Sequence, residues 1–75
     1  MELSTRIRKI REAQGLTQAD VAYKANISPQ AYGKIERTAS RTKLDTLIRL
    51  SEILEVSLVF LLDMQNPNHK QKNNL

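Results

Sequence analysis

The sequence predicts an all-α protein built from five helices. Apolar residues recur every three to four positions along most of the first 63 residues, which is the period of amphipathic helices. Residue types that begin and end helices stand between these runs. Alternating apolar runs and paired turn dipeptides, which indicate β-strands, are absent. With 75 residues, 40% of them apolar, the chain is expected to form one small domain with a packed core.

Local signals place the first two helices. Apolar residues at helical spacing predict a helix over residues 3–14, which Gly15 ends as a C′ residue. Thr17 is a typical N-cap for a second helix over residues 18–25. Asn26 then tolerates the left-handed conformation that a tight turn needs.

A third helix is predicted over residues 29–37, after a turn in which we expect Ile27 to be buried. Ser28 is its N-cap, and Pro29 occupies the first helical position, where its missing N–H costs nothing. The residues of this helix expected to face the core are Ala31, Tyr32 and Ile35.

The second half of the chain predicts an exposed basic loop, two more helices and a tail. The loop spans residues 38–43, and the helices span residues 44–54 and 58–63. The stripe of the fourth helix expected to face the core comprises Leu44, Leu47, Ile48, Ser51 and Leu54. Residues 64–75 are polar, so we expect a disordered tail outside a domain of residues 1–63.

The composition argues against several classes of protein. The chain has no cysteine and His69 is its single histidine, so neither a metal site nor another cofactor is expected. No apolar run approaches the ~20 residues that span a bilayer, and no signal-peptide pattern opens the chain. We expect a cytoplasmic protein with no membrane partner and no small-molecule ligand. An enzyme is not expected, because no acid, base or nucleophile converges on one face.

The net charge of +4 is unevenly distributed. Residues 1–43 carry nine basic against four acidic side chains, residues 44–63 carry one against four, and residues 64–75 add two lysines. A basic half suits a polyanion, and the acidic segment suits a different task.

Two helices joined by a three-to-four-residue turn form a predicted helix-turn-helix. The ordered motifs over residues 3–63 resemble those of Cro and phage repressors, the xenobiotic-response-element family. These motifs are Gly15-Leu16-Thr17-Gln18, Val21-Ala22, Ile27-Ser28, Ile35-Glu36-Arg37 and the run from Leu47 to Leu54. The resemblance implies a lambda-repressor-like fold and sequence-specific binding of double-stranded DNA, with the recognition helix in the major groove. It also implies a bacterial or phage-encoded, nucleoid-associated regulator of transcription, either a repressor or an autoregulating controller.

The recognition helix offers several candidates for contacts with base edges. They are Ser28, Pro29, Gln30, Gly33 and Lys34. Gln30 can pair with adenine N6 and N7, and Lys34 can donate to guanine O6 and N7. Gly33 either lets the backbone approach DNA closely or accommodates crowding against a neighbouring helix. The alternative for the whole surface is a solvated helix face without a role in DNA binding.

Further residues are implied by the resemblance. The expected phosphate contacts are Thr17, Gln18, Arg37, Ser40, Arg41 and Lys43. Gln18, at the N-terminus of the second helix, is expected to bridge a phosphate and the recognition helix by touching Gln30. Arg11 and Glu36 match a partly buried ion pair that links the first and third helices in related proteins. A basic surface loop without a DNA role is the alternative for the residues that follow the recognition helix.

The last helix predicts a dimer. Once it buries one face, Val59 and Phe60 are left over, and with Met64 they indicate a symmetric interface. The alternative is that Phe60 folds into the core. Two copies would read an inverted repeat with half-sites about 34 Å apart. The alternative function is a protein-interaction module, such as an antitoxin whose main partner is a toxin, because residues 64–75 could fold on a partner.

Overall fold

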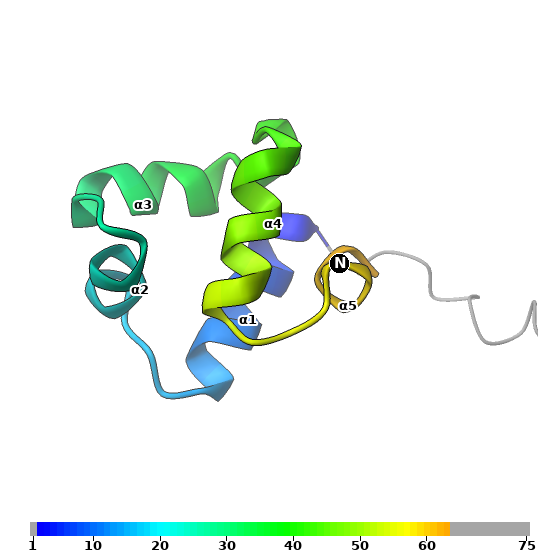
Figure 1. Ribbon diagram of the computed structural model, residues 1–75, viewed down its shortest axis with the longest axis horizontal. Helices are drawn as coiled ribbons and strands as arrows, with labels where there is room; N and C mark the ends of the chain where they lie inside the picture. Colours follow the sequence, from blue (N-terminus) through cyan, green and yellow to red (C-terminus); the bar gives the residue numbers. More distant parts are fainter. Residues whose placement is uncertain (1, 64–75) are drawn as a thin grey trace, which may run out of the picture.

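Five α-helices and one short 3₁₀ turn build the protein (Figure 1). The computed structural model describes residues 2–63, and none of these lies in a strand. In chain order the elements are α1 (Leu3–Ala13), α2 (Gln18–Ala25), α3 (Pro29–Arg37), η1 (Ala39–Arg41), α4 (Leu44–Ile53) and α5 (Leu58–Leu62). The all-α prediction is confirmed. The bounds of α2 and α3 agree with the sequence prediction, and the other three α-helices each end one residue earlier.

Side-chain caps explain where α2 and α3 begin. Thr17 Oγ1 accepts from the backbone N–H of Asp20 at 3.0 Å, and Asp20 Oδ2 accepts from the N–H of Thr17 at 2.8 Å. This reciprocal capping box satisfies two N–H groups that the helix cannot pair itself. Ser28 Oγ accepts from the N–H of Ala31 in the same way. Asn26 ends α2 in the left-handed conformation, at φ 62°.

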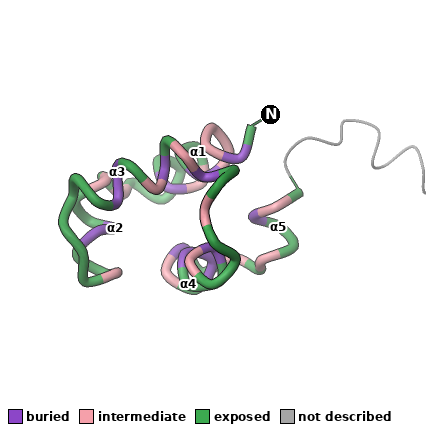
Figure 2. The backbone as a smooth tube through the Cα atoms, turned by 90° about the horizontal axis from the view of Figure 1, so that it is seen from above, coloured by how far each residue is buried: buried purple, intermediate pink, exposed green. Residues whose placement is uncertain are grey.

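The helices are arranged with the two halves of the helix-turn-helix at one end. Figure 1 shows α2 and α3 at that end, α5 at the other, and α1 and α4 between them. Each α-helix contributes a buried segment to one core (Figure 2). The largest fully buried side chains are Tyr32, Ile7, Leu54, Leu61 and Val21.

Several expectations about burial are wrong. In α4 the buried residues are Leu47, Leu50, Ser51 and Leu54. Leu44 and Ile48, which were expected in this stripe, lie on its flank, and Leu44 is 57% exposed. The apolar side of α4 is therefore wider than the part of its surface that the other helices cover.

The turn and the recognition helix also differ from expectation. Ile27 and Ala31 are exposed, whereas Gly33 is buried. Helix α3 turns its Gly33 edge toward α2, which leaves Ala31 in solvent. The segment expected as an exposed loop contains η1, and Ala39 is fully buried in it against α1.

Candidate nucleic-acid interface

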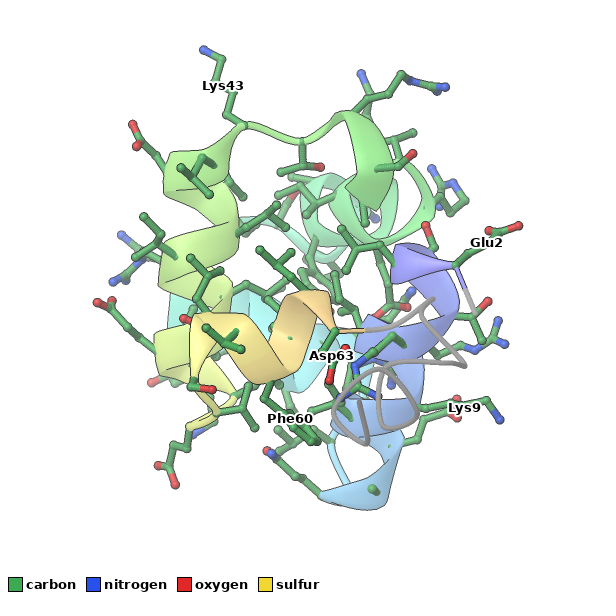
Figure 3. All side chains as sticks on the ribbon, turned by 90° about the vertical axis from the view of Figure 1, so that its right-hand side faces the viewer. Glu2, Lys9, Lys43, Phe60 and Asp63 are labelled. Carbon is green, nitrogen blue, oxygen red and sulfur yellow. The ribbon has the colours of Figure 1, made fainter. Side chains whose placement is uncertain are left out.

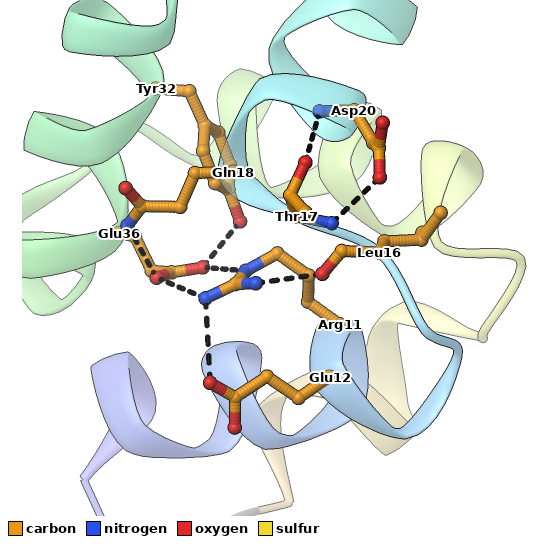
Figure 4. Close-up of polar contacts among 8 residues, drawn as sticks. All are labelled: Arg11, Glu12, Leu16, Thr17, Gln18, Asp20, Tyr32 and Glu36. Atoms are coloured by element: carbon orange, nitrogen blue, oxygen red, sulfur yellow. Dashed lines mark hydrogen bonds and ion pairs between the residues drawn. The ribbon is translucent and has the colours of Figure 1, made fainter.

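A buried polar network around Glu36 joins α1, α2 and α3 (Figure 4). Arg11 Nε donates to Glu36 Oε2 at 2.8 Å, and Arg11 Nη2 donates to Oε1 at 3.2 Å. Gln18 Nε2 donates to Oε1 at 2.9 Å, and the Tyr32 hydroxyl donates to Oε2 at 2.7 Å. Arg11 Nη1 also donates to the carbonyl of Leu16 at 2.8 Å. The ion pair expected from the resemblance therefore forms between α1 and α3, and the bond from Gln18 adds α2 to the network.

The hydrogen bonds of this network keep Glu36 ionised. Burial by itself raises the pKa of Glu36, but hydrogen bonds from Arg11, Gln18 and Tyr32 outweigh this effect and lower the pKa. Burial raises the pKa of Tyr32, and its hydrogen bond to Glu36 raises it further. The hydrogen bond with Glu36 raises the pKa of Arg11. At neutral pH the network thus holds one carboxylate, one guanidinium and a neutral phenol.

Four of the five residues expected to contact bases lie exposed at α3. They are Ser28, Pro29, Gln30 and Lys34. The Ser28 oxygen caps α3 as an acceptor, which leaves its hydroxyl proton available to another acceptor. Gln30 and Lys34 are one turn apart and share one side of the helix.

Gly33 does not belong to this exposed face. A Cβ at Gly33 would lie 3.2 Å from Arg37 Nη1 and 3.6 Å from Gln18 Oε1. Its surface is therefore covered by side chains of its own helix and of α2. This geometry agrees with crowding against a neighbouring helix and leaves no bare backbone for DNA.

Gln18 contacts the recognition helix at a different residue from the one expected. Its amide donates to Glu36 rather than to Gln30. Gln30 lies in the first turn of α3, whereas Glu36 lies in its last turn and faces α1 and α2. The contact between Gln18 and the recognition helix, which the resemblance implied, is therefore confirmed, but its expected partner Gln30 is wrong.

The expected phosphate contacts at the end of the recognition helix and beyond it lie exposed at the surface. They are Arg37, Ser40, Arg41 and Lys43. Within residues 2–63, none of these three cations forms an ion pair. Lys43 extends away from the body of the protein (Figure 3). Thr17 is exposed as well, with its oxygen engaged in the α2 cap.

The far end of the molecule exposes apolar side chains on α5. Val59 is 78% exposed and Phe60 is 49% exposed, so Phe60 does not fold into the core. Figure 3 looks onto this end, with Phe60 on the α1 side of α5. Leu44 and Ile48 of α4, which were expected to face the core, are exposed apolar residues as well. Met64 lies outside the described residues, as does the whole segment 64–75 on which the interaction-module alternative rests.

Metal-ligand clusters and membrane-spanning helices were the two other features sought in residues 2–63. No three His, Cys, Asp or Glu side chains come together there as metal ligands. None of the helices between residues 2 and 63 is both long and apolar enough to cross a membrane.

Comparisons with known proteins agree with the geometry. The sequence model of a family described as helix-turn-helix matches residues 7–61. The chain is also similar to three proteins of Bacillus subtilis (strain 168). The uncharacterized HTH-type transcriptional regulator YobD is 32% identical over 71 residues, which cover 91% of this chain and 63% of that protein. The HTH-type transcriptional regulator ImmR is 32% identical over 75 residues, or 100% of this chain and 59% of the relative.

The third relative is an SPbeta prophage-derived uncharacterized HTH-type transcriptional regulator, YonR. It is 42% identical over 57 residues, which cover 76% of this chain and 53% of that protein. The chain thus spans between 53% and 63% of the length of these three relatives. No solved structure gives a significant match.

Proposed function

The chain belongs to the helix-turn-helix family of transcriptional regulators, of the type found in Cro and phage repressors, and on that premise we propose that it binds double-stranded DNA sequence-specifically. In this proposal α3 enters the major groove and α2 lies across the backbone. The observation that carries it is the exposed polar side of α3 on a helix that the Glu36 network holds in place. A fixed orientation matters because base contacts need side chains held in register with the groove.

Sequence is read by the first turns of α3. Gln30 pairs with adenine N6 and N7, and Lys34 donates to guanine O6 and N7. Ser28 donates its free hydroxyl proton to a base or a phosphate, and the ring of Pro29 contacts a thymine methyl. Because Gly33 is covered, we remove it from the base-contacting set.

Affinity is supplied by contacts to phosphates. Thr17 and Gln18 lie at the N-terminus of α2, where free N–H groups and the helix dipole favour an anion. The exposed side chains at the end of α3 and after it that take further phosphates are Arg37, Ser40, Arg41 and Lys43. Arg37, Arg41 and Lys43 form no ion pair within residues 2–63, which supports this role, since each phosphate neutralised releases counterions.

The protein acts as a symmetric dimer joined at α5. Val59 and Phe60 supply the centre of the interface, because adjacent exposed apolar side chains commonly mark a contact surface. Such a dimer reads an inverted repeat with half-sites about 34 Å apart. By occupying a promoter it acts as a repressor or as an autoregulating controller.

The test is a selection of binding sites from random duplex DNA, followed by a salt titration of the selected site. Gln30→Ala should weaken binding to the selected site and leave binding to unrelated DNA unchanged. Arg41→Ala should weaken both alike and lower the salt slope by about one. Arg49→Ala, on the acidic helix α4, is the matched control and should change neither. If selection enriches no sequence, or if both test variants bind like the wild type, the proposal is wrong.

A further inference from the structure

The side chain of Arg37 lies back along α3 and covers Gly33. A Cβ built on Gly33 would stand 3.2 Å from Arg37 Nη1, which is tighter than an ordinary carbon contact. Helical side chains lean toward the N-terminus of their helix, so residue 37 naturally covers residue 33. Because Gly33 has no side chain, the guanidinium rests directly on the helix backbone. This contact helps to explain why Gly33 is buried although it lies near the protein surface.

Gln18 reaches the same place from α2. Its Oε1 would lie 3.6 Å from the added Cβ, so Arg37 and Gln18 converge above Gly33. Gln18 is the first residue of α2, and its amide is held by Glu36 at 2.9 Å. The backbone of Arg37 is held as well, because Ser4 Oγ donates to its carbonyl at 3.0 Å.

The positive charge of Arg37 is not paired with a carboxylate within the described part of the chain. The neighbouring carboxylate, Glu36, is paired with Arg11 instead. Arg37 itself forms no ion pair among residues 2–63. The guanidinium therefore adds a free positive charge beside the first turn of α2.

We propose that Gly33 is a positioning residue for DNA binding, which keeps open the slot in which the Arg37 guanidinium lies beside the start of α2, so that Arg37 and the free N–H groups of that helix end bind one phosphate of the DNA backbone. This inference rests on the proposed function and refines it. Arg37 then acts at the beginning of α2, rather than on the backbone beyond the end of α3. Glycine destabilises a helix interior relative to alanine. Gly33 therefore lowers the stability of α3 but allows the Arg37 guanidinium to lie against the helix backbone.

The test compares Arg37→Ala, Gly33→Leu and the double variant in the full chain. The probe is a mixed-sequence duplex of about 20 base pairs, because a phosphate contact affects all sequences alike. Arg37→Ala should weaken binding about tenfold and lower the salt slope by about one. Gly33→Leu fills the slot with a residue that favours helices, and it should reproduce both effects. The double variant should bind no more weakly than Arg37→Ala alone.

A smaller substitution gives a second readout. Gly33→Ala should raise the Tm in a thermal unfolding experiment and still weaken DNA binding, because the alanine improves helix propensity while it displaces the guanidinium. A structural role in packing α2 on α3 would instead lower the Tm. A lowered Tm would therefore overturn the inference.

Three results in the DNA experiment would also overturn it, and they are distinguishable. If Gly33→Leu binds like the wild type, the slot does not position Arg37. If Gly33→Leu causes the same loss in the Arg37→Ala background, the new side chain clashes with DNA directly. If the wild type binds no duplex even at low salt, the proposed function is wrong, and this inference, which depends on it, is wrong as well.

Discussion

Arg6 binds the backbone of Phe60 and stacks on its ring. Its Nε and Nη2 donate to the Phe60 carbonyl at 3.0 and 2.8 Å, and its Cζ lies 4.3 Å from the ring centroid. The two residues are 54 positions apart in the chain. One side chain of α1 thus fixes both the backbone and the aromatic ring of α5.

Replacing Arg6 should loosen α5. We expect Arg6→Ala to lower the free energy of unfolding by about 1 kcal/mol, because a charge-assisted pair of hydrogen bonds and a cation–π contact are lost at a partly exposed site. Urea denaturation followed by circular dichroism measures this loss. Arg8→Ala is the matched control, because Arg8 is an exposed arginine of the same helix that makes none of these contacts. Equal effects of the two substitutions would contradict the assigned role.

A charge on the outer side of α5 should separate the proposed dimer. Val59→Glu places a carboxylate where two copies would meet, and like charges across an interface disfavour association. Sedimentation velocity should then show a monomer at concentrations at which the wild type is dimeric. Tyr23→Glu is the control, because Tyr23 is 87% exposed on α2, away from α5. A wild type that remains monomeric at high micromolar concentration would refute the dimer.

Removing both partners of the buried ion pair should cost less than the sum of the two single removals. Glu36→Leu leaves the buried Arg11 guanidinium with only the exposed carboxylate of Glu12, 3.8 Å away, as a counterion, and we expect it to lower the free energy of unfolding by about 3 kcal/mol. The double variant with Arg11→Met removes the stranded charge as well, so its loss should be smaller than the sum of the single losses. A double-mutant cycle by chemical denaturation measures this coupling. Additive losses would mean that the pair contributes no interaction energy.

Acid should weaken the same network. Because the folded pKa of Glu36 lies below its ordinary value of 4.5, the ionised carboxylate stabilises the fold above that pH. This stability is lost as the pH falls through the folded pKa. The advantage of the wild type over Glu36→Gln should therefore shrink between about pH 5 and about pH 3. Asp20, whose pKa is lowered by hydrogen bonds from Thr17, is present in both proteins and cancels from the difference. An advantage that does not change with pH would contradict the assignment.

Glu55 offers a stabilising substitution. It follows α4 in the left-handed conformation at φ 57°, which strains a residue that has a Cβ. Glu55→Gly should raise the free energy of unfolding by about 1 kcal/mol, because glycine adopts this conformation without strain. Asn26→Gly is the control at φ 62°, and its gain should be smaller since asparagine tolerates this region. Differential scanning calorimetry measures both, and equal Tm shifts would count against this explanation.

Local chemistry made the helix-turn-helix predictable. Thr17 and Ser28 cap α2 and α3 through hydrogen bonds to residues three positions ahead, and Asn26 adopts the conformation expected of its residue type. Such signals depend only on neighbouring residues, so they can be read from the sequence. The Arg11–Glu36 pair was expected only from the resemblance, since the two residues belong to different helices.

Features set by distant neighbours could not be predicted. The stripe of α4 contains Leu44 and Ile48 at helical spacing, but the placement of the other helices decides which edge is covered. The Arg6–Phe60 contact joins the beginning of the domain to its last helix and has no local signal. The role of Gly33 depends on where two longer side chains come to rest.

Helix α1 is attached to both ends of the molecule. Ser4 and Arg11 bind α3, and Arg6, on the intervening turn, binds α5. In the proposed dimer, helix α1 of each copy therefore fixes the distance between its recognition helix and the interface at α5, and so the distance between the two recognition helices. A half-site spacing that departs from this distance has to be met by bending or twisting the DNA. On the proposed mode of binding, the stiffness of the base pairs between the two half-sites then contributes to sequence recognition.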